Sequence, residues 1–370
     1  MSADVREWIA LSLVTGIGAR MAGRLLERFG SPTQIFAASR SELRAFGLEE
    51  ETIDRLHSEE PRRRAEAELE KLAKLGAEAL TLEDPRYPPH LRRIYDPPIV
   101  LYARGRVEIL TSPALAIVGT RRPSPYGVNV ATELARDLAR RGLVIVSGFA
   151  RGIDAAAHRG ALEAKGRTVA VFGTGLDIIY PREHRALAEQ ICEQGVLVTE
   201  FPMGVSPLPQ NFPFRNRIIS GMSVGVIVVE AAERSGSLIT ARLALEQDRE
   251  VFAVPGPITS PRSYGPNYLI KCGAKLVQYW GDVVEELPLD IRREILRQEG
   301  EPITTQQLPL PLSENEQRVL ELLHVDAPTH IDELLVRSGL QIPELMRILL
   351  ELEVKDKIRQ LPGKHFVKKM

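Results

Sequence analysis

The sequence contains only two cysteines, Cys192 and Cys272, and no CxxC pair or Cys/His cluster. Small disulfide scaffolds and structural zinc sites are built on closely spaced cysteines, so neither is expected here. No other pattern in the chain requires a metal or a cofactor. The scarcity of cysteine favours a reducing cytoplasm as the setting of the protein.

Long apolar stretches are absent too. The chain has no run of about 18 apolar residues, the length that a membrane-spanning helix needs. No charged segment followed by an apolar one opens it. We therefore expect no membrane span and no export, and a cytoplasmic protein.

A strong net charge is also lacking, because the formal value is −1. A chain this close to neutral has no global field that would attract nucleic acid, so any such binding must come from a local patch. Residues 111–220 provide one candidate, with thirteen Lys and Arg against nine Asp and Glu.

What is present is an ordinary globular composition, 44% hydrophobic and 26% charged, over 370 residues. This length allows two or three domains. We divide the chain into a helical domain (1–75), an α/β domain (76–290), a linker rich in Gln, Pro and Thr (291–312) and a C-terminal domain (313–370).

The first domain has apolar residues at helical spacing on both sides of Thr15-Gly16-Ile17-Gly18, and more weakly around Phe46-Gly47-Leu48. Two helices joined by a Gly-apolar-Gly turn are typical of a helix-hairpin-helix or SAM-like domain. The N–H groups of such a turn often hold DNA phosphate. A tight helical turn without a ligand is the alternative.

The α/β domain contains short, β-branched, fully apolar runs separated by helical stretches. Strands without polar alternation are buried on both faces, which is typical of a parallel sheet covered by helices. We therefore predict a Rossmann-like, doubly wound, mostly parallel sheet. The predicted strands are 99–102, 115–118, 143–146, 168–172, 196–198, 224–229 and 251–254.

The C-terminal domain begins with a capping box formed by Ser313 and Glu316. Three short helices and a hairpin that turns at Pro362-Gly363 favour a winged-helix-like domain. Residues 313–356 hold four Lys and Arg against ten Asp and Glu. This excess of negative charge should repel phosphate, so a partner-docking or degenerate winged helix is as plausible as a DNA reader.

Glycines, arginines and serines follow the carboxyl ends of the predicted strands, where ligands bind in doubly wound sheets. Glycines there let backbone N–H groups approach an anion, and arginines add charge. The residues that we select on this ground are Gly119, Arg121, Arg122, Gly148, Arg151, Arg182, Ser235, Gly236 and Ser237.

The stretch from Asn211 to Ser220 combines aromatic rings with Arg215-Asn216-Arg217. Pro209 and Pro213 predict an extended entry, with a helix beginning near Arg217. An exposed Phe212 beside arginines could stack on an unpaired base. The alternative is that the aromatic rings are core residues and the arginines pair with carboxylates.

Residues 115–280 closely resemble the DNA-processing protein A family (DprA, also called Smf). The motifs that carry this resemblance are Gly119-Thr-Arg121 with Tyr126-Gly127, Ser147-Gly148 through Gly152-Ile-Asp154 to Ala157-His158, Gly175-Leu-Asp177, Tyr180-Pro181, Phe212-Pro-Phe-Arg-Asn-Arg-Ile-Ile219, Glu230-Ala231, Ser235-Gly-Ser-Leu238 and Val251-Phe-Ala-Val-Pro-Gly256.

The resemblance implies a homodimer that binds single-stranded DNA and loads the RecA recombinase during natural transformation. The family is not known for catalysis, so we do not expect an enzyme. The DNA pocket would then fall on Arg121, Arg182 and Phe212, beside Arg215-Asn216-Arg217. The alternative is that Arg215 and Arg217 tie their helix to Glu200 or Glu230, a structural role that the sequence leaves open.

Two enzymatic interpretations compete with this one. A nicotinamide dehydrogenase is disfavoured because Gly173-x-Gly175 lacks the third glycine of the dinucleotide motif. A nucleotide-binding or phosphoribohydrolase-type enzyme of the lysine-decarboxylase-like fold would need paired acids. Asp154, Asp177 and Glu230 are candidates, although the glutamate of the usual motif has no clear counterpart. For His158, one helical turn after Asp154, we expect a local Asp–His hydrogen bond.

Overall fold

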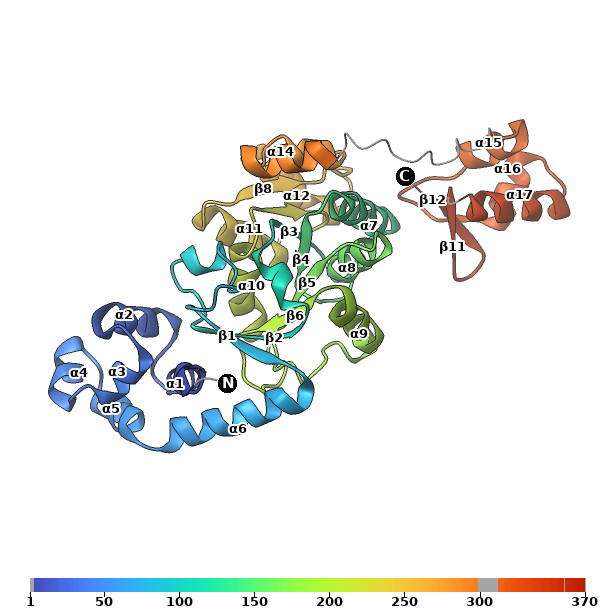
Figure 1. The fold of residues 1–370 in the computed structure, drawn as a ribbon. Helices are drawn as coiled ribbons and strands as arrows, with labels where there is room; N and C mark the ends of the chain where they lie inside the picture. The colour runs from blue at the N-terminus through green and yellow to red at the C-terminus, as the bar shows by residue number, and fades with distance from the viewer. Residues whose placement is uncertain (1–2, 299–311, 356, 370) are drawn as a thin grey trace.

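The computed structural model describes residues 3–298, 312–355 and 357–369 (Figure 1). Six helices come first along the chain, and side chains cap the starts of two of them, α3 and α4. Ser31 caps one helix, Ser39 and Glu42 form a capping box on the next, and Gly47 ends that helix in a left-handed conformation. The helices are α1 (Ala3–Ser12), α2 (Ala19–Phe29), α3 (Pro32–Ala37), α4 (Arg40–Phe46), α5 (Glu50–His57) and α6 (Glu60–Leu75).

Two helix pairs occupy the positions that the sequence indicated. Residues 13–18 join α1 to α2, and residues 47–49 join α4 to α5. Gly16 in the first turn has φ +100°, and a Cβ atom there would lie 2.5 Å from the Thr52 hydroxyl oxygen. Glycine is therefore required at this turn by backbone conformation and by space.

The sheet of the α/β domain has nine strands in the order β1-β2-β6-β5-β4-β3-β7-β8-β9. The strands from β6 to β9 in this order run parallel, and β1 and β2 add an antiparallel edge. The predicted doubly wound fold is thus confirmed. The strands are β1 (Glu78–Thr81), β2 (Val100–Gly105), β3 (Ala114–Val118), β4 (Val144–Ser147), β5 (Thr168–Val171), β6 (Val196–Thr199), β7 (Gly225–Val228), β8 (Glu250–Ala253) and β9 (Lys275–Leu276).

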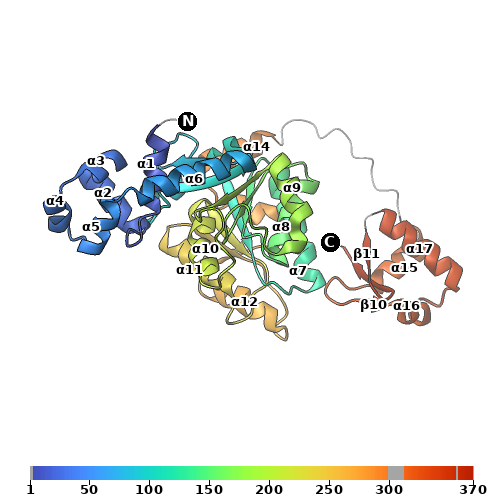
Figure 2. The ribbon, with the colours of Figure 1, turned by 90° about the horizontal axis from the view of Figure 1, so that it is seen from below.

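Helices cover both faces of the sheet (Figure 2). Alternate residues of each strand point to opposite faces, so Val146 of β4 packs with the layer that includes α10 and α11, whereas Ile145 packs with the layer that includes α7 and α8. The covering helices are α7 (Pro125–Arg140), α8 (Ile153–Glu163), α9 (Arg185–Gln194), α10 (Asn211–Gly221), α11 (Gly236–Glu246), α12 (Tyr264–Lys271), α13 (Trp280–Val284) and α14 (Leu289–Gln298).

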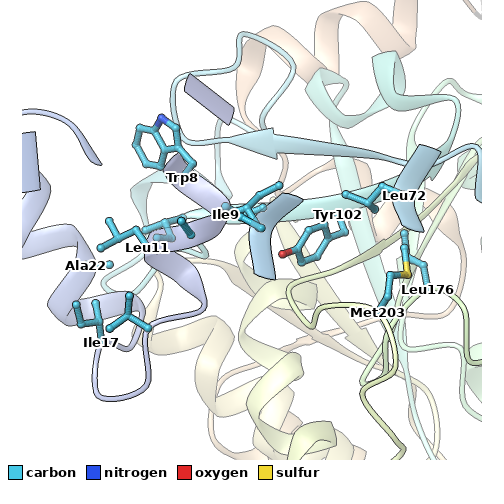
Figure 3. Packing of buried hydrophobic residues seen from close by; sticks show 14 of the residues in the cluster. Trp8, Ile9, Leu11, Ile17, Ala22, Leu72, Tyr102, Leu176 and Met203 are labelled. Atoms are coloured by element: carbon cyan, nitrogen blue, oxygen red, sulfur yellow. The ribbon is translucent and has the colours of Figure 1, made fainter. Parts of the chain in front are cut away.

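The N-terminal helices and the sheet share one apolar core (Figure 3). Trp8 of α1 and Leu72 of α6 belong to the same buried cluster as Tyr102 of β2 and Met203, which follows β6. The Glu68 carboxylate of α6 also accepts a hydrogen bond from the Met203 N–H at 2.5 Å. The expected boundary after residue 75 falls at the end of α6, but it does not separate two hydrophobic cores.

The C-terminal domain has its own core around Val319, Leu334, Leu349 and Phe366. Three helices and a three-stranded sheet in the order β10-β12-β11 confirm the predicted winged helix. These elements are α15 (Glu314–Glu321), β10 (Thr329–His330), α16 (Ile331–Ser338), α17 (Ile342–Val354), β11 (Ile358–Leu361) and β12 (His365–Lys368).

The expected linker at 291–312 begins inside a helix, because α14 continues to Gln298. Most of the remaining linker, residues 299–311, lies outside the described residues. Within the described ranges, no helix is both long enough and apolar enough to cross a bilayer.

His158 is fully buried in α8, and its environment holds it in the neutral form. The Thr168 hydroxyl donates to the Ile145 carbonyl, so its oxygen accepts the hydrogen of His158 Nδ1 at 2.7 Å. The expected bond to Asp154 is not formed, because that carboxylate lies beside Arg215 and accepts the Ala150 N–H. Burial, together with His184, Arg215 and Arg159, lowers the pKa of His158 to about 3.

This burial predicts a pH-dependent loss of stability. Below about pH 6.5 the unfolded chain protonates His158 while the folded chain does not, so the free energy of unfolding falls as the pH falls toward 3. Between pH 7.5 and 5.5 we expect this residue to account for a loss of about 1 kcal/mol. Chemical denaturation of the wild type and His158→Gln at both pH values measures it. An equal pH effect in the two proteins would contradict the assignment.

Candidate nucleic-acid-binding site

A cavity of about 580 Å³ opens at the carboxyl ends of the parallel strands. It lies beside β3, whose neighbours β4 and β7 lead to opposite halves of the sheet. This is the switch point where doubly wound sheets bind ligands. The lining residues are Val118, Gly119, Thr120, Arg121, Arg122, Ala150, Asp154, Tyr180, Pro207, Pro209, Phe212, Pro213, Arg215, Asn216, Ile219, Ser235, Gly236, Ser237 and Thr240.

The loop from Gly119 to Ser124 carries the exposed charge of the cavity. The buried Glu230 carboxylate accepts the Ser124 N–H at 2.8 Å and its hydroxyl at 2.6 Å, which fixes the far end of the loop. At the near end, the Thr120 N–H donates to the Glu230 carbonyl at 2.7 Å, and a Cβ atom on Gly119 would lie 2.9 Å from the same oxygen. Arg121 and Arg122 are therefore exposed on a loop that is anchored at both ends.

Two polar side chains hold the start of α11 at the cavity. The Ser235 hydroxyl accepts the Ser237 N–H at the start of α11, and the Asn216 amide of α10 donates to the Gly236 carbonyl at 3.4 Å. The first N–H groups of a helix have no intrahelical partner and favour anions. The start of α11 thus adds to the positive potential of Arg121 and Arg122.

Helix α10 begins at Asn211, earlier than predicted. Pro213 lies in its first turn, where a missing N–H removes no helical hydrogen bond, so the proline does not prevent the helix. The Asn211 amide donates to the Gly173 carbonyl at 3.1 Å and holds this end of α10 against the end of β5. The early start places Phe212 in the first turn and directs it to the cavity.

Phe212 forms part of the cavity wall and is only half-buried. The Arg121 guanidinium lies 5.3 Å from its ring centroid and that of Arg215 lies 5.9 Å away. Tyr180 contributes a second ring at 5.6 Å. A Cβ atom at Gly173 would lie 3.0 Å from the Phe212 ring, so the glycine makes room for it. The ring is positioned by its neighbours and remains accessible.

Arg215 lies at the floor of the cavity and is buried. Its Nη1 donates to the carbonyls of both Gly148 and Val171, which holds the guanidinium against the ends of β4 and β5. Burial lowers its pKa to about 10, which leaves it charged at neutral pH, and Asp154 is the nearby counter-charge. Burial also raises the pKa of Asp154, while Arg215 acts in the opposite direction.

Arg217 corrects one expectation. Its buried guanidinium binds both oxygens of Glu200 at 3.0 and 2.6 Å and the Asp96 carboxylate at 3.0 Å. It is not among the residues that line the cavity. The structural role that the sequence left open, a tie to Glu200, is the one that the structure shows.

Three other selected residues lie outside the cavity lining. Arg151 forms an exposed ion pair with Glu183. Arg182 borders a separate hollow with Asp177 and Arg185. Gly148 lies beneath the cavity, where a Cβ atom would be 2.7 Å from the Asp154 carboxylate. The other nine selected residues line the cavity, and these are Gly119, Arg121, Arg122, Phe212, Arg215, Asn216, Ser235, Gly236 and Ser237.

Tyr180 is the main site residue that the selection missed. In the sequence it belongs to the Tyr180-Pro181 motif, and its ring contact with Phe212 joins the loop after β5 to the first turn of α10. The three acids considered for an enzyme do not converge. Asp154 lines the cavity, Asp177 accepts the Gly204 N–H, and Glu230 is bound to Ser124. In the part of the chain that the structure describes, no group of His, Cys, Asp and Glu is arranged to hold a metal.

The fold and the cavity define a class: a doubly wound α/β protein with an arginine- and aromatic-lined site at its switch point, joined to a winged helix. A family model for DNA recombination-mediator protein A matches residues 78–288, and one for the DprA winged helix domain matches residues 304–364. The chain belongs to the DprA/Smf family.

Relatives support this membership over most of the chain. Protein Smf of Escherichia coli is 44% identical over 310 residues, covering 82% of this chain and 80% of that protein. DprA of Bacillus subtilis is 44% identical over 251 residues, which cover 68% of this chain and 82% of that protein. The X-ray structure of DprA from Streptococcus pneumoniae superposes with a TM-score of 0.63 at 34% identity, covering 78% of this chain and 99% of that one.

The structure of DprA from Helicobacter pylori is described by its single-stranded DNA binding mode. It superposes with a TM-score of 0.52 at 31% identity, covering 60% of this chain and 96% of that one.

The two arginines Arg121 and Arg217 should respond differently to truncation. Arg217→Ala would leave Glu200 and Asp96 without their partner, so we expect a loss of about 3 kcal/mol of stability. Arg121→Ala removes an exposed side chain that makes no ion pair among the described residues, so a change within about 0.5 kcal/mol is expected. Denaturant unfolding measures both values. Comparable losses would show that Arg121 is also structural.

Proposed function

We propose that this protein binds single-stranded DNA in the cavity at its strand ends. The observation that carries the proposal is the placement of a half-exposed Phe212 ring beside the exposed Arg121. Stacking on an aromatic ring needs an unpaired base, and arginine contacts phosphate without reading sequence. The H. pylori relative, described by a single-stranded DNA binding mode, supports the same ligand.

The proposal extends to the fate of the bound strand. The family is described as DNA recombination mediators. In our proposal the protein acts as a homodimer, protects incoming single-stranded DNA and loads the RecA recombinase on it during natural transformation. We also propose that it performs no catalytic step; of the three candidate acids, only Asp154 lines the cavity.

Binding should therefore favour unpaired DNA. We expect a labelled single strand to bind more tightly than a blunt duplex of the same sequence, with little sequence preference and a steep loss of affinity with salt. Fluorescence anisotropy over a salt series measures this. Equal affinity for both DNAs at moderate salt would contradict the proposed pocket, and turnover of a mononucleotide would favour the enzymatic alternative.

Paired variants separate stacking from charge. Phe212→Ala should weaken binding by about 1–3 kcal/mol with the salt slope unchanged, because stacking releases no counterions. Arg121→Ala should also reduce the salt slope, by about 0.7 for one phosphate contact on a single strand. A melting curve of Phe212→Ala is the control. A stability loss of about 3–5 kcal/mol would show that Phe212 is a core residue instead.

The winged helix should be dispensable for this binding. The helices of this domain are acidic, since residues 313–356 carry ten acidic against four basic side chains. Only the tail is basic, with Lys357, Arg359, Lys364, Lys368 and Lys369. The exposed face of α17 presents Ile342, Met346 and Leu350 in place of a basic row. A chain that ends at Gln298 should bind a single strand within a few-fold of the full-length protein. A hundredfold loss, in a fragment shown to be folded and of unchanged oligomeric state, would place the winged helix in the DNA site.

A further inference from the structure

A second set of aromatic and arginine side chains begins just outside the cavity. Phe214 follows Phe212 by two residues, so it lies on nearly the opposite side of α10, and it is 48% exposed. The Arg217 guanidinium lies 4.3 Å from its ring centroid, and Phe201 supports it from another side. Arg217 is already bound by Glu200 and Asp96, so it holds the ring in place and leaves one face of Phe214 open.

The same ion pair leads to the segment between β1 and β2. Asp96, which binds Arg217 at 3.0 Å, is adjacent in sequence to Tyr95. Tyr95 is 72% exposed, and the Arg20 guanidinium of α2 lies 4.7 Å from its ring centroid. A continuous series of contacts thus runs from α10 at the cavity to α2 in the N-terminal helices.

Helix α2 continues the series with a row of arginines. Arg20, Arg24 and Arg28 are exposed and recur every fourth residue, so they lie on one side of the helix about 6 Å apart along its axis. Glu27 also lies on this helix, but among the described residues none of the three arginines forms an ion pair. Arg40, Arg44 and Arg55 of the neighbouring helices are all bound to carboxylates.

Like charges at this spacing destabilise a helix, and a tyrosine as exposed as Tyr95 adds little to the core. Arg24 and Arg28 also lie 5.2 and 6.0 Å from the ring centroids of Phe46 and Phe29, contacts that leave their positive charge without a carboxylate partner among the described residues. Phe214 and Tyr95 expose aromatic surface, and the arginines beyond them expose positive charge. Alternating rings and cations are what proteins use to bind unpaired nucleic acid along its backbone.

We propose that Phe214, Tyr95, Arg20 and Arg24, here called the Tyr95 track, form a second segment of the single-stranded DNA path. The track carries a strand that leaves the cavity across to the N-terminal helices. Phe214 and Tyr95 stack on bases, and Arg20 and Arg24 contact phosphates. The inference rests on the proposed function, because the track extends the strand that the cavity holds.

Strand length separates the two sites. Oligothymidylates of about 6 and about 20 nucleotides are compared, since only the longer one can leave the cavity and reach α2. Tyr95→Ala in the full chain should weaken binding of the long strand about five- to 100-fold and leave the short strand unchanged. Arg20→Gln should weaken the long strand and lower its salt slope by about 0.7. Tyr95→Phe keeps the ring and should bind as the wild type does.

Two controls accompany these variants, one for charge and one for folding. Arg44→Gln changes an exposed arginine of the same domain that is bound to Glu50, off the track, and should have no effect. Melting curves measure whether each variant is folded, and we expect all of them to be, because the substituted positions are exposed. If the wild type binds both strands and Tyr95→Ala and Arg20→Gln bind them with unchanged affinity, the Tyr95 track is overturned. The proposed function of the cavity would still stand.

Other outcomes are equally informative. Failure of the wild type to bind either strand would overturn the proposed function itself. An equal loss for short and long strands in Tyr95→Ala would place this residue in the cavity site and overturn a separate segment. An equal loss for blunt duplex would identify the arginine row as a surface for paired DNA, which also overturns the proposal.

Discussion

The site depends on the hydrogen bonds and the ion pairing of the buried Arg215. Its guanidinium joins the ends of two neighbouring strands through the carbonyls of Gly148 and Val171, and Asp154 at the start of α8 balances its charge. Removing one member of such a group would leave a buried charge uncompensated, which costs several kcal/mol. Helix α10 is held in this way against β4, β5 and α8, and Phe212 in its first turn takes its position from that arrangement.

Glu230 has the corresponding role on the other side of the cavity. The Glu230 carboxylate accepts hydrogen bonds from the N–H and the hydroxyl of Ser124. These bonds fix the loop that carries Arg121 and Arg122. Two of the most prominent charged residues at the strand ends, Arg215 and Glu230, thus act on the architecture of the site. The ligand-facing charge is left to arginines on the loop and to the start of α11, which are less deeply buried.

The sequence predicts the sheet well because each strand from β3 to β8 is a short apolar run, a pattern that a buried parallel strand produces on its own. It predicts which loops meet, because parallel strands end at one edge. It cannot predict where a long side chain points. Arg121 and Arg217 are equally basic in sequence, yet one is exposed and the other is enclosed by Glu200 and Asp96, acids that are distant along the chain. The prolines predict an extended entry and a helix start near Arg217, but α10 starts at Asn211, because a proline in the first turn removes no helical hydrogen bond.

The division between buried and exposed charge has a consequence for binding. Phe212 is already held by Gly173, Arg121 and Arg215 in the free protein, so stacking a base on it requires little further ordering of the side chain. Arg215 and Arg217 have lost their water on folding, so a strand that enters does not have to remove it. A protein with a net charge near zero can then bind DNA through a few exposed arginines. Its long-range attraction for phosphate is confined to one edge of the sheet.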